Sequence, residues 1–313
     1  MDFLFAALGL VILVLAGDSL VKGAVNLSLR VGIPALIVSL TIVAFGTSAP
    51  ELLISIAAVE DGVPGLALGN VVGSNTANVL LVLGIPALLA GLHTADCDTK
   101  RSYIQMLAAT FLFIAVCFLG PITWIHGLVL LGALALMLGD ALREARAHRK
   151  AQEDEEEEVE GADPNMSWPK IILFLLLGLI GLPLGADLLV DASINIARAF
   201  GISEEVIGLT LVAFGTSLPE LATTVMASIR RQADVALGNV IGSNMFNLLA
   251  IIGITGLVGT IPVTEEFLRF DLWVMLGASL LLIPFVYFRV NLTRVAGVVL
   301  TGLYAAYVVM LLT

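Results

Sequence analysis

The sequence predicts an all-α polytopic membrane protein with ten transmembrane helices, arranged as two inverted repeats of five helices each. Three observations support this prediction: the apolar composition, the recurrence of apolar runs, and a pair of motifs that occurs twice. Of the 313 residues, 59% are hydrophobic and only 13% are charged, whereas soluble domains are about 45 to 50% apolar. A water-soluble fold cannot hide so much apolar surface.

Apolar runs long enough to span a bilayer recur along the whole chain. A transmembrane helix needs about 20 mostly apolar residues. The ten predicted runs cover residues 3–24, 33–58, 66–91, 103–121, 123–140, 170–197, 204–229, 235–258, 271–289 and 293–312. The first run has no basic segment before it and no convincing cleavage site after it, so we expect a retained helix rather than a secretory signal.

The basic residues predict the orientation of the helices. With ten spans both termini lie on one side of the membrane, and each loop can be assigned to a side by counting crossings. Of the 15 lysines and arginines, only Arg198 and Arg269 fall on the side of the termini. The positive-inside rule therefore predicts that both termini lie outside.

The chain aligns with itself at an offset of 169 residues, without gaps. The segment Gly46–Glu51 (GTSAPE) matches Gly215–Glu220 (GTSLPE), and residues 69–75 (GNVVGSN) match residues 238–244 (GNVIGSN). Between positions 39 and 80, 22 of the 42 aligned pairs are identical. Each half carries five spans, an odd number, so the second half enters the membrane inverted, as is typical of secondary transporters.

These repeats predict three parts: a first repeat at 1–142, a charged linker at 143–169 and a second repeat at 170–313. The linker begins basic and turns acidic, because seven of the 26 acidic residues lie between Glu153 and Glu160. Blocks of like charge are usually solvated connectors. We expect a cytoplasmic linker, with calcium sensing as the alternative.

Each copy of the first motif contains a proline inside an apolar span. Pro50 has no N–H for the carbonyl of Gly46, and Pro219 has none for that of Gly215, so both helices should break or kink. A broken helix is tolerated in hydrocarbon only where the freed carbonyls are buried in protein or face a water-filled cavity, and such carbonyls are good cation ligands. The breaks therefore mark a candidate site.

A glutamate follows each proline in the middle of a span, where an ionisable group is costly and by default functional. Helical spacing places a backbone carbonyl, two hydroxyls and the carboxylate on one face of each half. The two sets are Ala44, Thr47, Ser48 and Glu51, and Ala213, Thr216, Ser217 and Glu220.

The following helices carry polar side chains spaced by four: Asn70, Ser74 and Asn78, and Asn239, Ser243 and Asn247. All bear oxygen, which Ca²⁺ and Na⁺ prefer, and no histidine or cysteine joins them, which argues against zinc or copper. For Asn70 and Asn239, ligation and interhelical hydrogen bonding remain equally open. Four glycines on these helices are expected to serve close packing: Gly69, Gly73, Gly238 and Gly242.

Other polar groups give weaker signals. Asp18, Asp187 and Asp191 lie toward helix ends, where water could solvate them, and we assign them no role. Cys97 and Cys117 fit neither a metal-ligand spacing nor a disulfide framework. No nucleophile, metal triad or cofactor motif accompanies the glutamates, so we expect neither an enzyme nor a cofactor.

The duplicated Gly-Thr-Ser-x-Pro-Glu and Gly-Asn-x-x-Gly-Ser-Asn motifs closely resemble the α-repeats of sodium/calcium exchangers in the calcium/cation antiporter superfamily. The likeness covers essentially the whole chain. It implies exchange of Na⁺ for Ca²⁺ at mid-membrane, with alternating access produced by movement of the first and sixth helices. The implied setting is a prokaryotic cell (inner) membrane, with Ca²⁺ and Na⁺ as substrates, the lipid bilayer as partner and no nucleic acid.

The resemblance also implies residue roles, position by position. Glu51 and Glu220 match the central carboxylates shared by Ca²⁺ and Na⁺. The hydroxyls of Thr47, Thr216, Ser74 and Ser243 match sodium ligands, and Ala44 and Ala213 match backbone-carbonyl ligands. Ser48 and Ser217 match neighbours of the site, while Asn78 and Asn247 match its remaining polar pair.

One departure from the family concerns the coupling ratio. Some family members have an aspartate where this chain has Asn247, so this site holds two carboxylates rather than three. Two carboxylates neutralise one Ca²⁺ or two Na⁺ but leave a third Na⁺ uncompensated, so three-for-one coupling remains open. A proton-coupled antiporter, a potassium-dependent exchanger and a cation channel are the alternative functions, and coupled-flux measurements discriminate among them.

Overall fold

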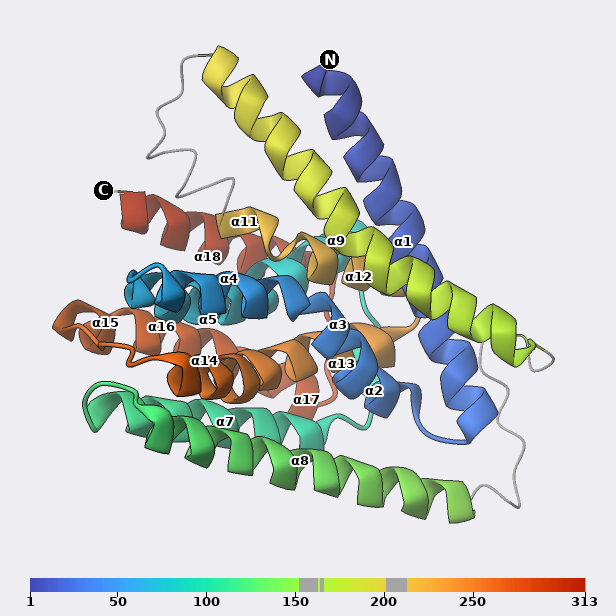
Figure 1. The fold of residues 1–313 in the computed structure, drawn as a ribbon. Coiled ribbons are helices and arrows are strands. Elements are labelled where there is room, and N and C mark those ends of the chain that lie inside the picture. Colours follow the sequence, from blue (N-terminus) through green and yellow to red (C-terminus); the bar gives the residue numbers. More distant parts are fainter. Residues whose placement is uncertain (152–162, 164–165, 201–212, 313) are drawn as a thin grey trace.

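The computed structural model describes residues 1–151, 163, 166–200 and 213–312 (Figure 1). In these residues eight helices are long and apolar enough to cross a membrane, or nine if the bent pair Ala35–Thr47 and Ala49–Glu60 is one span. The remaining expected span, 204–229, lies partly outside the described residues. Its described part includes the apolar helix α12 (Leu218–Ile229).

The helices follow the expected spans closely. The first part of the chain contains α1 (Asp2–Val31), α2 (Ala35–Val38), η1 (Ser39–Val43), α3 (Ala44–Thr47), α4 (Ala49–Glu60), α5 (Pro64–Ala77), η2 (Asn78–Val82), α6 (Gly84–Leu89), the short η3 (Thr94–Asp96), α7 (Lys100–Phe118) and α8 (Trp124–Ala151). The second part contains α9 (Trp168–Ala199), α11 (Ala213–Gly215), α12, α13 (Ala233–Met245), η6 (Phe246–Ile251), α14 (Ile252–Val258), α15 (Glu265–Arg269), α16 (Asp271–Leu280), α17 (Ile283–Tyr287) and α18 (Arg294–Leu312).

Two helices extend beyond the expected boundaries. Helix α1 continues past residue 24 and ends at Val31, where Gly32 adopts the left-handed conformation of a C-terminal cap, with φ 70°. Helix α8 continues past residue 140 to Ala151, into the basic start of the linker. The helix continues beyond the apolar run because alanine, leucine, arginine and glutamate favour helix even where the chain leaves the hydrocarbon. The acidic part of the linker, 152–162, lies outside the described residues.

Helices α1 and α9 lie side by side and are tilted relative to the other helices (Figure 1). Glycines allow the close approach: a Cβ added at Gly178 would lie 2.4 Å from Cβ of Leu20, and one at Gly9 would lie 2.7 Å from the backbone nitrogen of Leu189. Since rising positions on α1 meet falling positions on α9, the pair is antiparallel. Small residues at such an interface give tight backbone packing in a membrane.

Glycines also bring the two motif regions together. A Cβ at Gly242 would lie 2.5 Å from the carbonyl oxygen of Leu40, and one at Gly238 would lie 2.8 Å from Cβ of Ser39. The Ser39 hydroxyl donates a hydrogen bond to the Val235 carbonyl at 2.6 Å. The expected packing role of these two glycines is confirmed. By the 169-residue offset, the corresponding neighbours of Gly69 and Gly73 fall at 205–209, outside the described residues.

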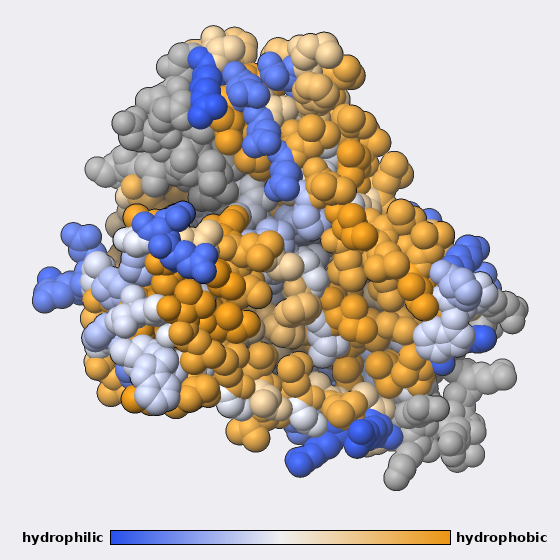
Figure 2. All heavy atoms as spheres, viewed as in Figure 1, coloured by the Kyte–Doolittle hydropathy of each residue, from blue (hydrophilic) through white to orange (hydrophobic). Residues whose placement is uncertain are grey.

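The described surface is strongly apolar. Figure 2 shows hydrophobic side chains over most of this face, with hydrophilic residues at its left and right sides, at its lower edge and in a strip that runs from the top toward the centre. Large side chains on outward faces are well exposed, such as Leu15 of α1 at 62%, Ile180 of α9 at 58% and Val295 of α18 at 73%. Exposed apolar area of this extent marks a surface that faces lipid.

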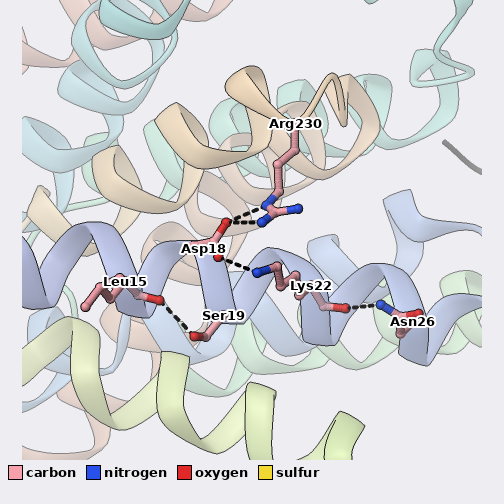
Figure 3. A network of polar contacts seen from close by, with 6 residues as sticks. All are labelled: Leu15, Asp18, Ser19, Lys22, Asn26 and Arg230. Atoms are coloured by element: carbon pink, nitrogen blue, oxygen red, sulfur yellow. Dashed lines mark hydrogen bonds and ion pairs between the residues drawn. The ribbon is translucent and has the colours of Figure 1, made fainter. Parts of the chain in front are cut away.

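Asp18 is not simply a solvated helix-end group, as the sequence suggested. It pairs with Lys22 on the same helix at 2.8 Å and with Arg230, directly after α12 (Figure 3). The side chains of Asp18 and Arg230 are 20% and 29% exposed. The network therefore fastens α1 to the end of the helix that carries Glu220.

Candidate functional site

Both proline-containing spans break where the sequence predicts. Helix α3 ends at Thr47 and α4 begins at Ala49, and the two segments meet at an angle of 43°. In the second half α11 ends at Gly215 and α12 begins at Leu218. Each proline then occupies the first turn of the new helix, where its missing N–H removes no hydrogen bond from the helix.

The breaks place each glutamate in the first turn of a helix. Glu51 lies in the first turn of α4 and Glu220 in that of α12, where free N–H groups and the helix dipole favour negative charge. Each of the two glutamates is only 1% exposed. The local structure therefore helps to hold an acid that the apolar surroundings disfavour.

Three π-helical turns surround the breaks, and no sequence signal predicted them. Segment η1 ends next to Ala44, η2 begins at Asn78 and η6 contains Asn247. A π-helical turn interrupts the regular α-helical bonding pattern and is frequent at functional sites. Each of these turns adjoins or contains a predicted site residue.

The two carboxylates lie close enough to interact. Glu220 lies within electrostatic range of Glu51, so the acids from the two halves share one region of the interior. The hydroxyl of Ser48 donates a hydrogen bond to Oε1 of Glu220 at 3.1 Å. A side chain of the first half therefore contacts the acid of the second.

Buried oxygens without hydrogen-bond partners are concentrated at the predicted site. Within the described part of the chain, eight buried side-chain polar atoms have no partner, and all are oxygens. Six belong to predicted site residues: Glu51 Oε2, Glu220 Oε2, Asn78 Oδ1, Asn247 Oδ1, Ser217 Oγ and Ser243 Oγ. Unpaired buried oxygens are costly, and six to eight oxygens are what Ca²⁺ binds. Their residues fit a hard cation.

The other predicted ligands are placed less uniformly. Thr47 Oγ1 lies 3.2 Å from Asn239 Oδ1 and 3.3 Å from the carbonyl oxygen of Ala44, which also accepts the amide hydrogen of Ser48 at 3.0 Å. Ser74 is buried at 5% exposure. Ala213 begins α11, but its side chain lies outside the described part of the structure.

Thr216 lines a cavity of about 280 Å³, together with Pro50, Pro219, Asp187 and Asp191 among others. The two prolines are the direct neighbours of Glu51 and Glu220 in the sequence. The cavity therefore reaches the helix breaks from the C-terminal half of α9, where Asp187 and Asp191 lie. The sequence alone assigned no role to these aspartates.

Asn70 and Asn239 support the helices that carry the acids. Asn70 Nδ2 donates to the carbonyl of Glu51 at 3.4 Å and to Ser55 at 3.3 Å. Asn239 makes the same two contacts with Glu220 and Thr224, at 3.4 and 3.2 Å. Interhelical hydrogen bonding, one of the two roles left open by the sequence, is therefore present in both halves.

The described residues contain no group of three or more histidine, cysteine, aspartate or glutamate side chains that could hold a metal ion. The predicted site instead combines two carboxylates with neutral hydroxyl and amide oxygens. This composition suits cations that bind oxygen.

Proteins of one family match this chain over nearly its whole length. The family described as sodium/calcium exchanger protein matches residues 1–139 and 170–313. The sodium/calcium exchanger MaX1 of Methanosarcina acetivorans is 35% identical, covering 99% of this chain and 98% of its own. The inner membrane protein YrbG of Escherichia coli is 33% identical, covering 97% and 94%. A solved structure of the sodium-calcium exchanger NCX_Mj, soaked with zero Na⁺ and Ca²⁺, has a TM-score of 0.83 at 31% identity and covers 99% of this chain and 98% of its own.

Proposed function

The chain belongs to the sodium/calcium exchanger family of membrane transporters, and on that premise we propose that it exchanges Na⁺ for Ca²⁺ at a cage of oxygens around Glu51 and Glu220. The predicted family membership is thereby confirmed, and the protein is not an enzyme. The observation that carries the proposed site is the set of six buried, unpartnered oxygens contributed by both halves.

The charge of this cage explains why transport is an exchange. Two carboxylates balance one Ca²⁺ or two Na⁺, and a further cation in the same dry space lacks a counter-charge. Ca²⁺ and Na⁺ therefore compete for Glu51 and Glu220, and one must leave before the other binds. The Na⁺:Ca²⁺ ratio follows from how a third Na⁺ is accommodated beside the neutral Asn247.

The proposed architecture is ten spans in two inverted repeats, 1–142 and 170–313, joined by the linker 143–169. Contacts of the site support it because they recur at the 169-residue offset: the partners of Asn70 map onto those of Asn239. The connecting segments behave alike, since Leu92 bridges Leu292 and Ile122 bridges Ile261. A shared twofold axis through the cage accounts for both patterns.

Alternating access follows from the unequal surroundings of the cage. On one side the cavity lined by Asp187 and Asp191 reaches the helix breaks. On the other side Asp18 and Arg230 fasten α1 to α12. We assign this conformation as outward-facing, with the antiparallel pair α1 and α9 as the element that moves between states.

The orientation supported by the basic residues places both termini outside and the linker in the cytoplasm. The similarity to an inner membrane protein of a bacterium favours a prokaryotic inner membrane. In this orientation the aspartate-lined cavity opens outward and the Asp18–Arg230 pair lies on the cytoplasmic side.

Uptake of ⁴⁵Ca²⁺ into proteoliposomes tests the function. We expect uptake when Na⁺ is loaded inside and removed outside, and none without the Na⁺ gradient. Imposed proton and K⁺ gradients are the controls: uptake driven by protons alone, or Na⁺-driven uptake that requires K⁺, would establish one of the two rival antiporters. Ca²⁺ flux that continues without any counter-ion would establish a channel.

A further inference from the structure

We infer that Asn75 and Asn244 are positioning residues that turn the amides of Asn78 and Asn247 so that each presents its oxygen, not its nitrogen, to the cation cage. The inference rests on the proposed function, because it explains how two expected ligands are oriented. Neither Asn75 nor Asn244 belongs to the set of ligands expected from the sequence.

An asparagine is an ambiguous cation ligand. Its amide ends in an oxygen and an NH₂ group of similar size, and only the oxygen can coordinate a cation. A 180° turn of the amide replaces a ligand with two hydrogen-bond donors that repel the ion. A cage with only two carboxylates depends on its neutral oxygens, so the orientation of Asn78 and Asn247 must be held.

The orientation of Asn78 follows from an atom that can only accept. Asn244 Nδ2 donates to the backbone carbonyl of Asn75 at 3.4 Å and lies 3.8 Å from Sδ of Met106. Since a carbonyl cannot donate, the nitrogen of Asn244 must lie at this end and its oxygen at the other. That oxygen accepts from Asn78 Nδ2 at 3.0 Å. Asn78 Oδ1 is thereby turned away from Asn244, and it has no partner among the described residues.

The same chain of contacts orients Asn247. Asn75 Nδ2 donates to the backbone carbonyl of Asn244 at 3.2 Å, which fixes the oxygen of Asn75 at the opposite end. That oxygen accepts from Asn247 Nδ2 at 3.0 Å. Asn247 Oδ1 is in turn left without a partner in the described structure. The two series of hydrogen bonds are related by the 169-residue offset. In each, one backbone carbonyl fixes the orientation of one asparagine ligand.

Burial makes the orientation costly to reverse. All four asparagines are at most 2% exposed, so water cannot replace a lost hydrogen bond. If Asn247 turned over, its oxygen would face the oxygen of Asn75, and two buried acceptors would oppose each other. In contrast to the ligands, both side-chain polar atoms of Asn75 and Asn244 are used within the network. They therefore act through their neighbours and not on the ion.

A double-mutant experiment with purified protein tests the pairing. Asn75→Leu removes the acceptor that orients Asn247, and Ca²⁺ affinity, measured by calorimetry, should fall about tenfold, the size expected for one lost buried hydrogen bond. Asn247→Asp has an oxygen at both ends and needs no orientation. In Asn247→Asp an oxygen already opposes Asn75 Oδ1, so adding Asn75→Leu should not weaken Ca²⁺ affinity.

Asn78→Asp is the matched control, because Asn78 is oriented by Asn244 and not by Asn75. In that background Asn75→Leu should still cost about tenfold. An unchanged affinity in Asn75→Leu, or an equal loss in both aspartate backgrounds, would mean that Asn75 is only structural and would overturn the inference. If Asn75→Leu does not fold, Asn244→Leu gives the mirror test: Asn78→Asp should rescue it and Asn247→Asp should not.

Exchange by the wild type, measured in the same series, distinguishes failure of the proposed function from failure of the positioning role. If the wild type shows no Na⁺-driven Ca²⁺ uptake, the proposed function fails. If it exchanges ions normally while the affinity pattern above is absent, only the positioning role fails.

Discussion

Ser48, at the helix break of the first half, donates its hydroxyl hydrogen to Oε1 of Glu220 in the second half, at 3.1 Å. Ser217 is its equivalent at the 169-residue offset, yet Ser217 Oγ has no hydrogen-bond partner in the described part of the structure. The two serines occupy equivalent motif positions but differ in bonding. In the described structure one hydroxyl is hydrogen-bonded and the other is not.

This asymmetry predicts different effects for two identical substitutions. Ser48→Ala removes a hydrogen bond to a carboxylate, so it should lower the stability of the ion-free protein by about 1 to 3 kcal/mol. Ser217→Ala removes an unpartnered oxygen, so it should leave that stability unchanged and weaken Ca²⁺ binding. Thermal melting of both variants with and without Ca²⁺ measures the two effects separately. Equal losses of ion-free stability would contradict the asymmetry.

Glu51→Gln and Glu220→Gln should abolish exchange without unfolding the protein. Each change removes a buried negative charge, so the ion-free protein should melt at the same temperature or higher. The stabilisation that Ca²⁺ provides by binding the folded state should disappear. Melting curves with graded Ca²⁺ and ⁴⁵Ca²⁺ uptake test this together. Strong Na⁺-driven uptake by either variant would refute the central role of that glutamate.

Most residues of the proposed cage could be named from the sequence because the motif that contains them occurs twice. A proline and a glutamate in mid-span, repeated at one offset, allow few alternatives to a broken helix that presents a carboxylate. The partner of each asparagine could not be predicted, because an alignment of Asn75 with Asn244 does not say that they touch. The π-helical turns at Asn78 and Asn247 also carry no composition signal, since tertiary packing and not local propensity selects them.

The role of Asp18 could not be inferred from its distance to a helix end. The sequence places it near water, but one of its two partners, Arg230, comes from a segment more than 200 residues away. Only the packing of α1 against α12 brings the two together. Pairing across such a distance cannot be inferred from the local pattern of charges.

Asp18→Asn should therefore destabilise the protein modestly. It leaves the partly buried Arg230 without its carboxylate, and the expected loss is about 1 kcal/mol or less, because the pair still reaches water. The loss should shrink at high salt, which screens the charges. Glu265→Gln is the control, since Glu265 and Arg269 form a pair that is largely exposed, at 83% and 79%, and its melting temperature should not change. Equal effects in both variants would argue against a structural role for Asp18.

The α1–α9 contact predicts a strong effect from a single methyl group. Gly178→Ala places a Cβ 2.4 Å from Cβ of Leu20, so the helices must move apart, at a cost of about 1 to 3 kcal/mol. Exchange should slow as well if this pair moves during transport. Gly132→Ala on α8 is the matched control, because nothing lies within 4 Å of its added Cβ, and alanine there should be neutral or stabilising. Similar melting temperatures for the two variants would contradict the close packing.

Membrane orientation can be tested with single cysteines at two exposed positions, Asp61→Cys and Ser167→Cys. The wild type is a suitable control because its two native cysteines should react little with maleimide. Cys117 is buried, and burial, together with nearby Asp234, raises the pKa of the Cys97 thiol. Cys97 therefore stays neutral at pH 7, and a neutral thiol reacts slowly with maleimides.

With both termini outside, residue 61 faces the exterior and residue 167 the cytoplasm. A membrane-impermeant maleimide added to intact cells should label Asp61→Cys at once, and Ser167→Cys only after the membrane is opened. The opposite pattern would reverse the orientation and place the aspartate-lined cavity on the cytoplasmic side. Because the outward-facing assignment depends on which side that cavity opens to, it would then have to be replaced by an inward-facing one.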